Sequence, residues 1–209
     1  IYKNKGSRSD KVNYRPISNL SVFGKCQEVC ADIQLREYLE KHGLYGHHQH
    51  GFRKARSTST ALQIALNRWR SNKISKKFQG SLFFYLSSAY DLLDAEIFIE
   101  KARICGIQGS ALKWLASYLT GRRQCVQVNQ EISSVQPLQV GTPQGSSCSC
   151  TIFAFFMGDL PLWAGDSLVL AYADDTNITV EANTEEELRM KLEEEGEKVL
   201  QFFRENKMV

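Results

Sequence analysis

Residues 168–180 read LVLAYADDTNITV, and this stretch decides how the chain of 209 residues folds. Two short apolar runs, 168–172 and 177–180, predict β-strands. Asp174 and Asp175 stand between the two runs, and Asp is a common turn residue. The stretch therefore predicts a tight β-hairpin that presents two adjacent carboxylates at its tip.

Two carboxylates held so close together repel each other, and a divalent cation is the usual compensation. Oxygen ligands suit Mg²⁺ or Mn²⁺, and two such ions about 3.5–4 Å apart can clamp an in-line phosphoryl displacement. An Asp-Asp pair is also common in ordinary turns. Taken alone, the pair favours neither interpretation over the other.

The sequence around the hairpin predicts a mixture of helices and strands. Helices are expected over 23–41, 58–73, 94–105 and 110–120, a strand over 81–86, and a second hairpin from 124–128 and 132–138. A glycine-rich turn at 141–145 precedes a further helix, and a capping-box pattern at 184–187 begins the last one. This mixture favours an α+β fold with an antiparallel sheet.

Composition and charge narrow the class of protein. Hydrophobic residues make up 43% of the chain, which excludes intrinsic disorder, and no uninterrupted apolar run is long enough to span a membrane. Residues 1–80 hold 16 Lys/Arg and 5 Asp/Glu, whereas residues 81–209 hold 10 and 18. The split favours a polyanion-binding lobe beside a carboxylate-bearing lobe. Solvated helix faces are the simpler alternative.

Six cysteines and four clustered histidines raise the question of a zinc site. None of them has the spacing of metal ligands, so buried or half-buried free thiols are favoured over zinc. Cys26, Val29, Cys30 and Ile33 lie on one expected apolar face of the first helix.

Two further motifs carry polar residues suited to nucleotides. GTPQGS at 141–146 is a glycine-rich turn before a helix, where backbone amides can approach a phosphate or a base edge. NYRPIS at 13–18 and QHGFRKARST at 49–58 interleave basic and aromatic residues, as nucleic-acid or phosphate binding requires.

In their order and spacing these motifs closely resemble the reverse transcriptase domain of non-LTR (LINE-type) retrotransposons. The resemblance covers nearly the whole chain and rests on NYRPIS, QHGFRKARST, LSSAYD (86–91), SYLTGR (117–122), GTPQGS, GDLP (158–161) and YADD (172–175). It implies the fingers and palm of a right-hand polymerase without a thumb. Residues 1–80 would be fingers-like and residues 81–209 palm, with a boundary near 74–80 and truncation at both ends.

The resemblance also implies an activity and its partners. These are RNA-directed DNA synthesis on an RNA template, a DNA primer, dNTPs and two Mg²⁺ ions, with Mn²⁺ as an alternative. A larger retrotransposon polyprotein would supply an endonuclease and a thumb. The implied location is intracellular, in a nuclear and cytoplasmic ribonucleoprotein, without a membrane.

Roles carry over to matching positions of this sequence. The resemblance implies metal binding and catalysis by Asp174 and Asp175, and contact with the incoming nucleotide by Arg15, Tyr90, Gln144 and Gly145. It implies template contact for Lys54 and Arg56, and template contact or fold support for Arg53.

One departure from the family pattern puts activity in doubt. The first catalytic motif of the family begins with Asp, and Tyr85 stands at that position here. A phenol is neutral at pH 7 and is a poor Mg²⁺ ligand. Serines and cysteines at 147–150 also stand where the family usually has apolar residues. Tyr85 and these four residues both support a degraded copy of the domain. The alternatives are therefore an RNA-directed DNA polymerase and a catalytically dead relic that retains at most RNA binding, and an error at one codon would also explain Tyr85.

Overall fold

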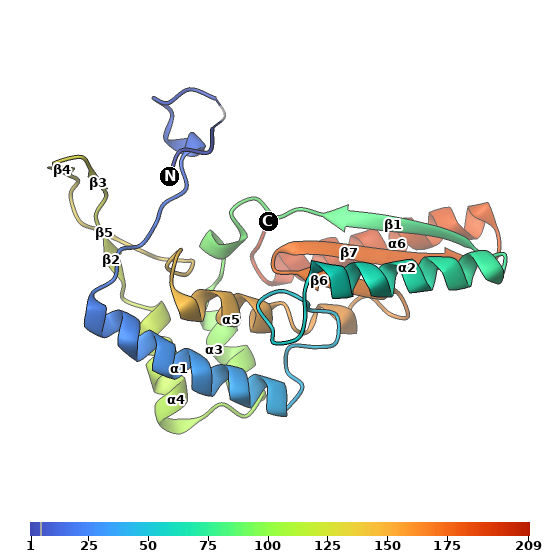
Figure 1. Ribbon diagram of the computed structural model, residues 1–209, viewed down its shortest axis with the longest axis horizontal. Coiled ribbons are helices and arrows are strands. Elements are labelled where there is room, and N and C mark those ends of the chain that lie inside the picture. The colour runs from blue at the N-terminus through green and yellow to red at the C-terminus, as the bar shows by residue number, and fades with distance from the viewer. Residues whose placement is uncertain (5) are drawn as a thin grey trace.

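The computed structural model describes residues 1–4 and 6–209 and contains a three-stranded antiparallel sheet flanked by helices (Figure 1). Its strands are β1 (Phe78–Phe84), β6 (Leu168–Tyr172) and β7 (Asp175–Ala182), in the order β1-β7-β6. The central strand β7 pairs with β1 from Phe78↔Ala182 to Phe84↔Thr176 and with β6 from Leu168↔Thr179 to Tyr172↔Asp175. The hairpin that the sequence predicts is therefore the centre of the fold.

Successive side chains of β1 point to opposite faces of the sheet, and the two faces pack against different helices. A Cβ at Gly80 would lie 2.8 Å from Leu192 of α6 (Glu185–Glu205), and Phe84 packs edge-on against Phe203 of the same helix. On the opposite face, the Trp69 indole of α2 (Thr58–Ile74) donates a hydrogen bond to Thr179. Helices α6 and α2 therefore cover opposite faces of the sheet (Figure 1).

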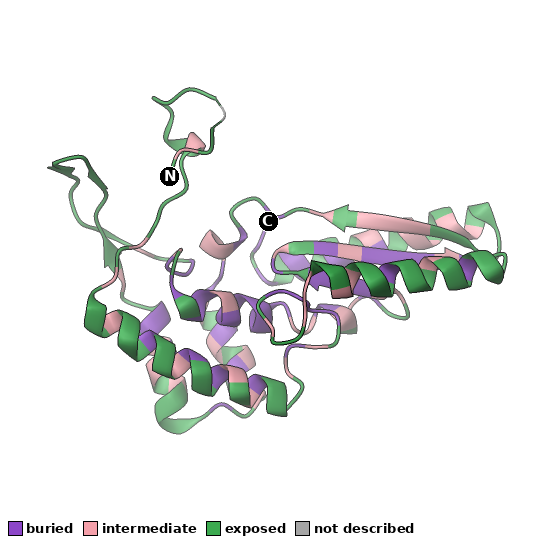
Figure 2. Cartoon of the chain, in the orientation of Figure 1, coloured by how far each residue is buried: buried purple, intermediate pink, exposed green. Residues whose placement is uncertain are grey.

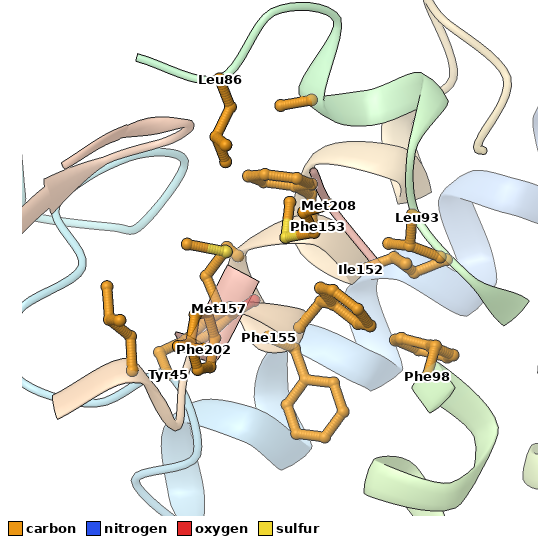
Figure 3. Close-up of a cluster of buried hydrophobic side chains, with 14 of the residues drawn as sticks. Tyr45, Leu86, Leu93, Phe98, Ile152, Phe153, Phe155, Met157, Phe202 and Met208 are labelled. Atoms are coloured by element: carbon orange, nitrogen blue, oxygen red, sulfur yellow. The ribbon is translucent and has the colours of Figure 1, made fainter. Parts of the chain in front are cut away.

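The main hydrophobic core lies between the sheet and a layer of helices. This layer contains α1 (Val22–Lys41), α3 (Ala95–Ile104), α4 (Gly109–Leu119) and α5 (Ser147–Phe156). Helix α5 is apolar around most of its circumference, and its residues from Thr151 to Phe156 are all buried. Figure 3 shows Phe155 of α5 near Phe98 of α3, and Phe202 of α6 belongs to the same cluster. The core thus joins α5 both to α3 in its own layer and to α6 on the sheet.

Two segments extend from this body and are mostly exposed (Figure 2). One is the N-terminal segment, which contains the short 3-10 helix η1 (Lys11–Asn13). The other is a broken hairpin made of β2 (Arg123–Gln124), β3 (Gln127–Val128), β4 (Glu131–Ile132) and β5 (Gln136–Pro137), in which β2 pairs with β5 and β3 with β4. Two further 3-10 turns, η2 (Ala89–Asp91) and η3 (Leu160–Leu162), complete the elements.

The α+β prediction with an antiparallel sheet and packed helices is confirmed. Among the individual elements, the strand expected over 81–86 was wrong in its bounds, because β1 begins at Phe78 and ends at Phe84. The hairpin expected over 124–138 forms only as two separate pairs of two-residue strands.

The apolar face predicted for the first helix was also wrong. Val29 and Ile33 are 46% and 52% exposed, whereas Glu28, Asp32, Leu35 and Leu39 are buried. The buried face includes Asp32 because its carboxylate accepts hydrogen bonds from Thr151 of α5 and from Arg36. The face that packs on the core is therefore fixed by Leu35 and Leu39 together with the hydrogen bonds of Asp32, and not by the stripe through Val29 and Ile33.

The prediction of buried or half-buried thiols holds for half of the cysteines. Cys148 is buried and Cys105 and Cys150 are partly buried, but Cys26, Cys30 and Cys125 are exposed, the first two because their helix face is turned outward. Within residues 1–4 and 6–209, no three His, Cys, Asp or Glu side chains are grouped to hold a metal ion. No helix in the described part of the chain is long and apolar enough to cross a membrane.

Candidate active site

The turn between β6 and β7 carries the two carboxylates. Tyr172 pairs with Asp175, so Ala173 and Asp174 form the two-residue tip. Ala173 has a φ of 60°, in the left-handed region that L residues seldom adopt. Asp174 is partly buried and Asp175 is exposed. The hairpin therefore holds both carboxylates at one end of the sheet.

The electrostatics of this tip favour a cation. Partial burial raises the pKa of Asp174, and the neighbouring negative charge of Asp175 raises it further. The positive charge of Arg15 acts in the opposite direction and lowers this pKa. Burial and the charge of Asp175 thus outweigh the opposing effect of Arg15 on the pKa of Asp174.

Tyr85 lies beside this pair. Phe84 is opposite Thr176 in the antiparallel pair of β1 and β7. One residue further along, Tyr85 therefore comes opposite Asp175. The Tyr85 side chain is 78% exposed. Tyr85 stands at the position at which the resemblance implies a third carboxylate. The two hard oxygen donors of Asp174 and Asp175 fit one divalent cation, but the second ion would lack a ligand that the resemblance implies.

The GTPQGS turn packs against the segment that follows Tyr85. The Gln144 side-chain amide donates to both carboxylate oxygens of Asp91, at 2.7 and 2.9 Å. Gly141 has a φ of 88°, and a Cβ there would lie 2.9 Å from the Asp91 backbone, so the turn needs glycine for two reasons. The Gln144 carbonyl accepts a hydrogen bond from the Ser18 amide, which connects NYRPIS to the same turn. Gly145 is exposed beside it.

Tyr90 lies between the helical core and the carboxylates. Its ring packs against Phe153 with centroids 4.6 Å apart. Burial raises the pKa of Tyr90, and the nearby Cys150 and Asp174 raise it further. The Tyr90 hydroxyl therefore stays neutral next to Asp174.

A loop from the first 80 residues holds the carboxylate turn from the other side. Gln49 is fully buried and its side-chain amide bonds to both backbone polar groups of Ala173. Sequence reasoning missed this residue as part of the site. Gln49 is the first residue of QHGFRKARST, but nothing in that motif indicates a partner 124 residues away.

The three basic residues of that motif have different surroundings. The Arg53 guanidinium bonds to both carboxylate oxygens of Glu40 at 2.8 and 2.6 Å, donates to the Gly46 carbonyl and lies over the Tyr45 ring. The hydrogen bond from Arg53 lowers the pKa of Glu40. This placement favours fold support, the second of the two roles predicted for Arg53.

Lys54 and Arg56 differ from Arg53. Lys54 is exposed, so its ammonium group faces solvent. Arg56 donates to the His47 carbonyl at 2.6 Å and is partly buried. Template contact therefore stays a prediction for both residues, and Lys54 has the freer side chain.

The polar residues at 147–150 are accommodated by the fold. Ser149 donates to the Pro143 carbonyl at 2.9 Å, and the Tyr118 hydroxyl is hydrogen bonded to Ser146 and Ser149. Cys148 is fully buried in the core. Ser149 thus supports the GTPQGS turn and Cys148 fills part of the core, and the interpretation of 147–150 as a sign of decay stays a prediction.

The family model of reverse transcriptase (RNA-dependent DNA polymerase) matches residues 1–209. The chain belongs to the reverse transcriptase family. Its similarity to the reverse transcriptases of non-LTR elements is confirmed by curated relatives from Drosophila. A probable RNA-directed DNA polymerase from transposon X-element of Drosophila melanogaster is 27% identical over 88% of this chain and 21% of its own length. The RNA-directed DNA polymerase from mobile element jockey of Drosophila funebris is 28% identical over 79% of this chain and 19% of its own length.

Solved structures support the same fold for this reverse transcriptase domain. An apo telomerase from Candida tropicalis, truncated from its C-terminal domain, aligns with a TM-score of 0.61 at 15% identity over 88% of this chain and 38% of its own. A telomerase from Candida albicans, in complex with a fragment of telomeric RNA, aligns with a TM-score of 0.55 at 12% identity over 79% and 31%. The domain spans about a fifth of the length of the curated relatives it matches.

Proposed function

We propose that this reverse transcriptase domain carries the nucleotide-binding and metal-binding site of an RNA-directed DNA polymerase, with residues 1–80 as fingers and residues 81–209 as palm. One observation carries the proposal. The hairpin holds Asp174 and Asp175 at one end of the sheet, beside the end of β1 that leads to Tyr90. Hydrogen bonds of the GTPQGS turn with Asp91 and Ser18 tie the segments of Tyr90 and Arg15 to each other. The two carboxylates, Tyr90 and Arg15 come from three distant motifs, and they are among the residues that the resemblance matched to nucleotide and metal binding.

The side chains suggest a division of roles. The exposed Arg15 would bind the triphosphate of the incoming nucleotide, since a guanidinium pairs well with phosphate oxygens. Tyr90, fixed against Phe153, would lie beside the sugar and exclude a 2′-hydroxyl. Gln144 and Gly145 would contact the nucleotide and template from the GTPQGS turn. The amide of Gln144 is already oriented by Asp91.

Asp174 and Asp175 would hold a divalent cation, Mg²⁺ or Mn²⁺. Such a cation supplies electrostatic stabilisation of the charge that develops on the phosphate during displacement by a primer 3′-hydroxyl. The adjacent placement of the two carboxylates fits this role, because a bound cation would offset their mutual repulsion. Lys54, which is exposed, and Arg56 would contact the RNA template.

The position of Tyr85 supports a second candidate, a catalytically dead relic that binds RNA. Tyr85 supplies no carboxylate beside Asp175, and its side chain faces solvent. Restoring the carboxylate should therefore increase activity by two or more orders of magnitude, because electrostatic stabilisation dominates such sites.

The deciding experiment compares the parent chain with Tyr85→Asp by primer extension on an RNA template, first with Mg²⁺ and then with Mn²⁺. Mn²⁺ titration in the absence of nucleic acid provides a second measurement that needs no primer or template. Phe83→Asp is the matched control, because Phe83 is 76% exposed on the same strand face two residues earlier. Phe83→Asp adds the same negative charge to β1, but not at position 85, where the family motif has its aspartate.

We expect Tyr85→Asp to gain Mn²⁺ affinity and DNA synthesis, and Phe83→Asp to gain neither. Robust synthesis by the parent chain would exclude the relic. A folded Tyr85→Asp variant that binds no Mn²⁺ would contradict the proposed polymerase site. Salt-dependent RNA binding without any synthesis would support the relic, since phosphate contacts release counterions.

A further inference from the structure

Gln49 uses its whole side-chain amide to hold the carboxylate turn. Its Oε1 accepts hydrogen bonds from the Ala173 amide at 3.0 Å and from the Gly51 amide at 2.8 Å, and its Nε2 donates to the Ala173 carbonyl at 3.3 Å. The residue is 0% exposed. Water therefore cannot replace these three hydrogen bonds if the amide is removed.

The backbone around Gln49 adds a short parallel pairing to the edge of β6. The Ala171 amide donates to the His48 carbonyl at 2.9 Å, and the His50 amide donates to the Ala171 carbonyl at 2.8 Å. These two bonds flank the Gln49↔Ala171 bridge. The loop is thereby fixed in register with the strand that leads into the turn.

Gly51 allows the loop to approach the turn closely. A Cβ at Gly51 would lie 2.4 Å from the Ala173 amide nitrogen and 3.1 Å from its Cα. Gly51 is not among the residues with a positive φ, so the close contact alone demands glycine there. A backbone atom of the turn would have to move to accept any side chain.

Ala173 needs such support. Its φ of 60° is unfavourable for alanine, and this conformation persists only where the surroundings determine it. Gln49 pairs with both the amide and the carbonyl of this residue. Asp174 follows directly, so the backbone conformation of Ala173 sets the direction in which the Asp174 carboxylate points.

We propose that Gln49 is a positioning residue that fixes the carboxylates of Asp174 and Asp175 in the geometry that binds a divalent cation. The inference rests on the proposed function, because it assigns Gln49 a role at that metal-binding site. Gln49 acts through the Ala173 backbone and contacts neither the cation nor the nucleotide. Movement of the carboxylates by about 1 Å is enough to weaken such a site strongly.

The test uses the full chain in the Tyr85→Asp background. Gln49→Met keeps a side chain of similar size and removes all three hydrogen bonds. Gly51→Ala keeps the Gln49 amide but pushes on the Ala173 backbone and on Gln49 Oε1, which would lie 3.0 Å from the new Cβ. Gln63→Met is the matched control, because Gln63 is exposed on α2. The measurements are Mn²⁺ affinity by titration, amide hydrogen exchange at Ala173 and at Ile178 of β7, and kcat and KM for primer extension.

We expect Gln49→Met and Gly51→Ala to weaken Mn²⁺ binding at least tenfold and to lower kcat more than they change the KM for primer–template. Exchange of the Ala173 amide should accelerate at least tenfold, while the amide of Ile178 in the same sheet stays protected. Gln63→Met should change none of these values. If Gln49→Met does not fold, Gly51→Ala carries the test.

The outcomes separate this inference from the proposed function. If the background protein binds no Mn²⁺, the proposed function fails and the role of Gln49 fails with it. If the background binds Mn²⁺ and both variants bind it equally well although Ala173 exchanges faster, only the positioning role is overturned. Gln49 would then be a structural residue of the loop.

Discussion

The carboxylate of Asp91 accepts two hydrogen bonds from the side-chain amide of Gln144, at 2.7 and 2.9 Å. The two residues are 53 positions apart and belong to the LSSAYD and GTPQGS motifs. Asp91 follows the missing carboxylate position by six residues but does not replace it, because its oxygens are directed to Gln144. Its role in this arrangement is to orient the Gln144 amide, for which we propose contact with the nucleotide.

Asp91→Asn should therefore weaken nucleotide binding without unfolding the domain. An asparagine keeps one acceptor and replaces the other by a donor, so one of the two hydrogen bonds to Gln144 is lost, at a cost of about 1–2 kcal/mol. In the Tyr85→Asp background we expect the KM for dNTP to rise about 5–10-fold while the domain stays folded, with Tm lowered by about 2–8 °C. Steady-state primer extension measures the effect. Asp166→Asn, at an exposed position, is the control and should leave the KM unchanged.

The parts of the fold that follow local rules could be predicted from the sequence. The hairpin at 168–180 and the helix that begins after Thr184 were predicted because their signals are strands, turns and caps close together in the chain. The Thr184 hydroxyl accepts a hydrogen bond from the Glu187 amide, as the capping pattern indicates.

The parts that depend on distant partners could not be predicted. Asp32 is buried on the inner side of α1 because Thr151, which is 119 residues away, donates to it, and apolar periodicity contains no trace of that hydrogen bond. The structural role of Arg53 is decided by Glu40 and by the Gly46 carbonyl, whereas the sequence showed only a basic motif. The candidate site was predicted from the motif resemblance. Gln49 was missed because its partner, Ala173, is distant in the sequence, as Thr151 is from Asp32.

Arg53→Lys should destabilise the domain although it keeps the charge. The guanidinium bonds to both oxygens of Glu40, donates to the Gly46 carbonyl and packs over Tyr45, and a lysine ammonium cannot reproduce this planar set of contacts. The Arg53 side chain is 9% exposed, so its contacts are poorly replaced by water. We expect a loss of about 2–3 kcal/mol in the free energy of unfolding, measured by urea denaturation.

Lys54→Ala provides the contrast for Arg53. Lys54 is exposed, and its removal should change the free energy of unfolding by less than about 0.5 kcal/mol. If Lys54 contacts the template, RNA affinity should fall and become less dependent on salt. An Arg53→Lys variant as stable as the parent would contradict the structural role of Arg53.

Asp32→Ala should cost more stability than a typical polar substitution. Asp32 is 7% exposed and accepts hydrogen bonds from the Thr151 hydroxyl and from Arg36 at 2.8 Å. Its removal leaves a buried hydroxyl and a partly buried guanidinium without their partner, at a cost of about 2–4 kcal/mol in unfolding free energy. Thermal and urea denaturation measure the loss. Glu37→Ala on the exposed side of the same helix should be nearly neutral, and an equal effect of both changes would contradict the assigned face.

Stability should fall on acidification because of His48. Burial lowers the pKa of His48 to about 4, with further lowering by the charges of Arg53, His50 and Arg56. A histidine with a depressed pKa in the folded state contributes stability that is present above its unfolded pKa near 6.5 and is lost as pH falls toward the folded value. Protons then bind the unfolded chain before they bind the folded one. The loss from this group between about pH 6.5 and pH 4 is on the order of 2–3 kcal/mol.

His48→Leu should remove this part of the pH dependence. Urea denaturation of the parent chain and of the variant at a series of pH values from 7 to 4 gives two curves, and their difference isolates His48 from the carboxylates that also titrate in this range. We expect the curves to converge or cross as pH falls, since the variant lacks the group that must charge. His47→Leu is the control, because His47 is exposed and its removal should leave the shape of the parent curve unchanged. Parallel curves for the parent and His48→Leu would show that His48 titrates alike in the folded and unfolded chains.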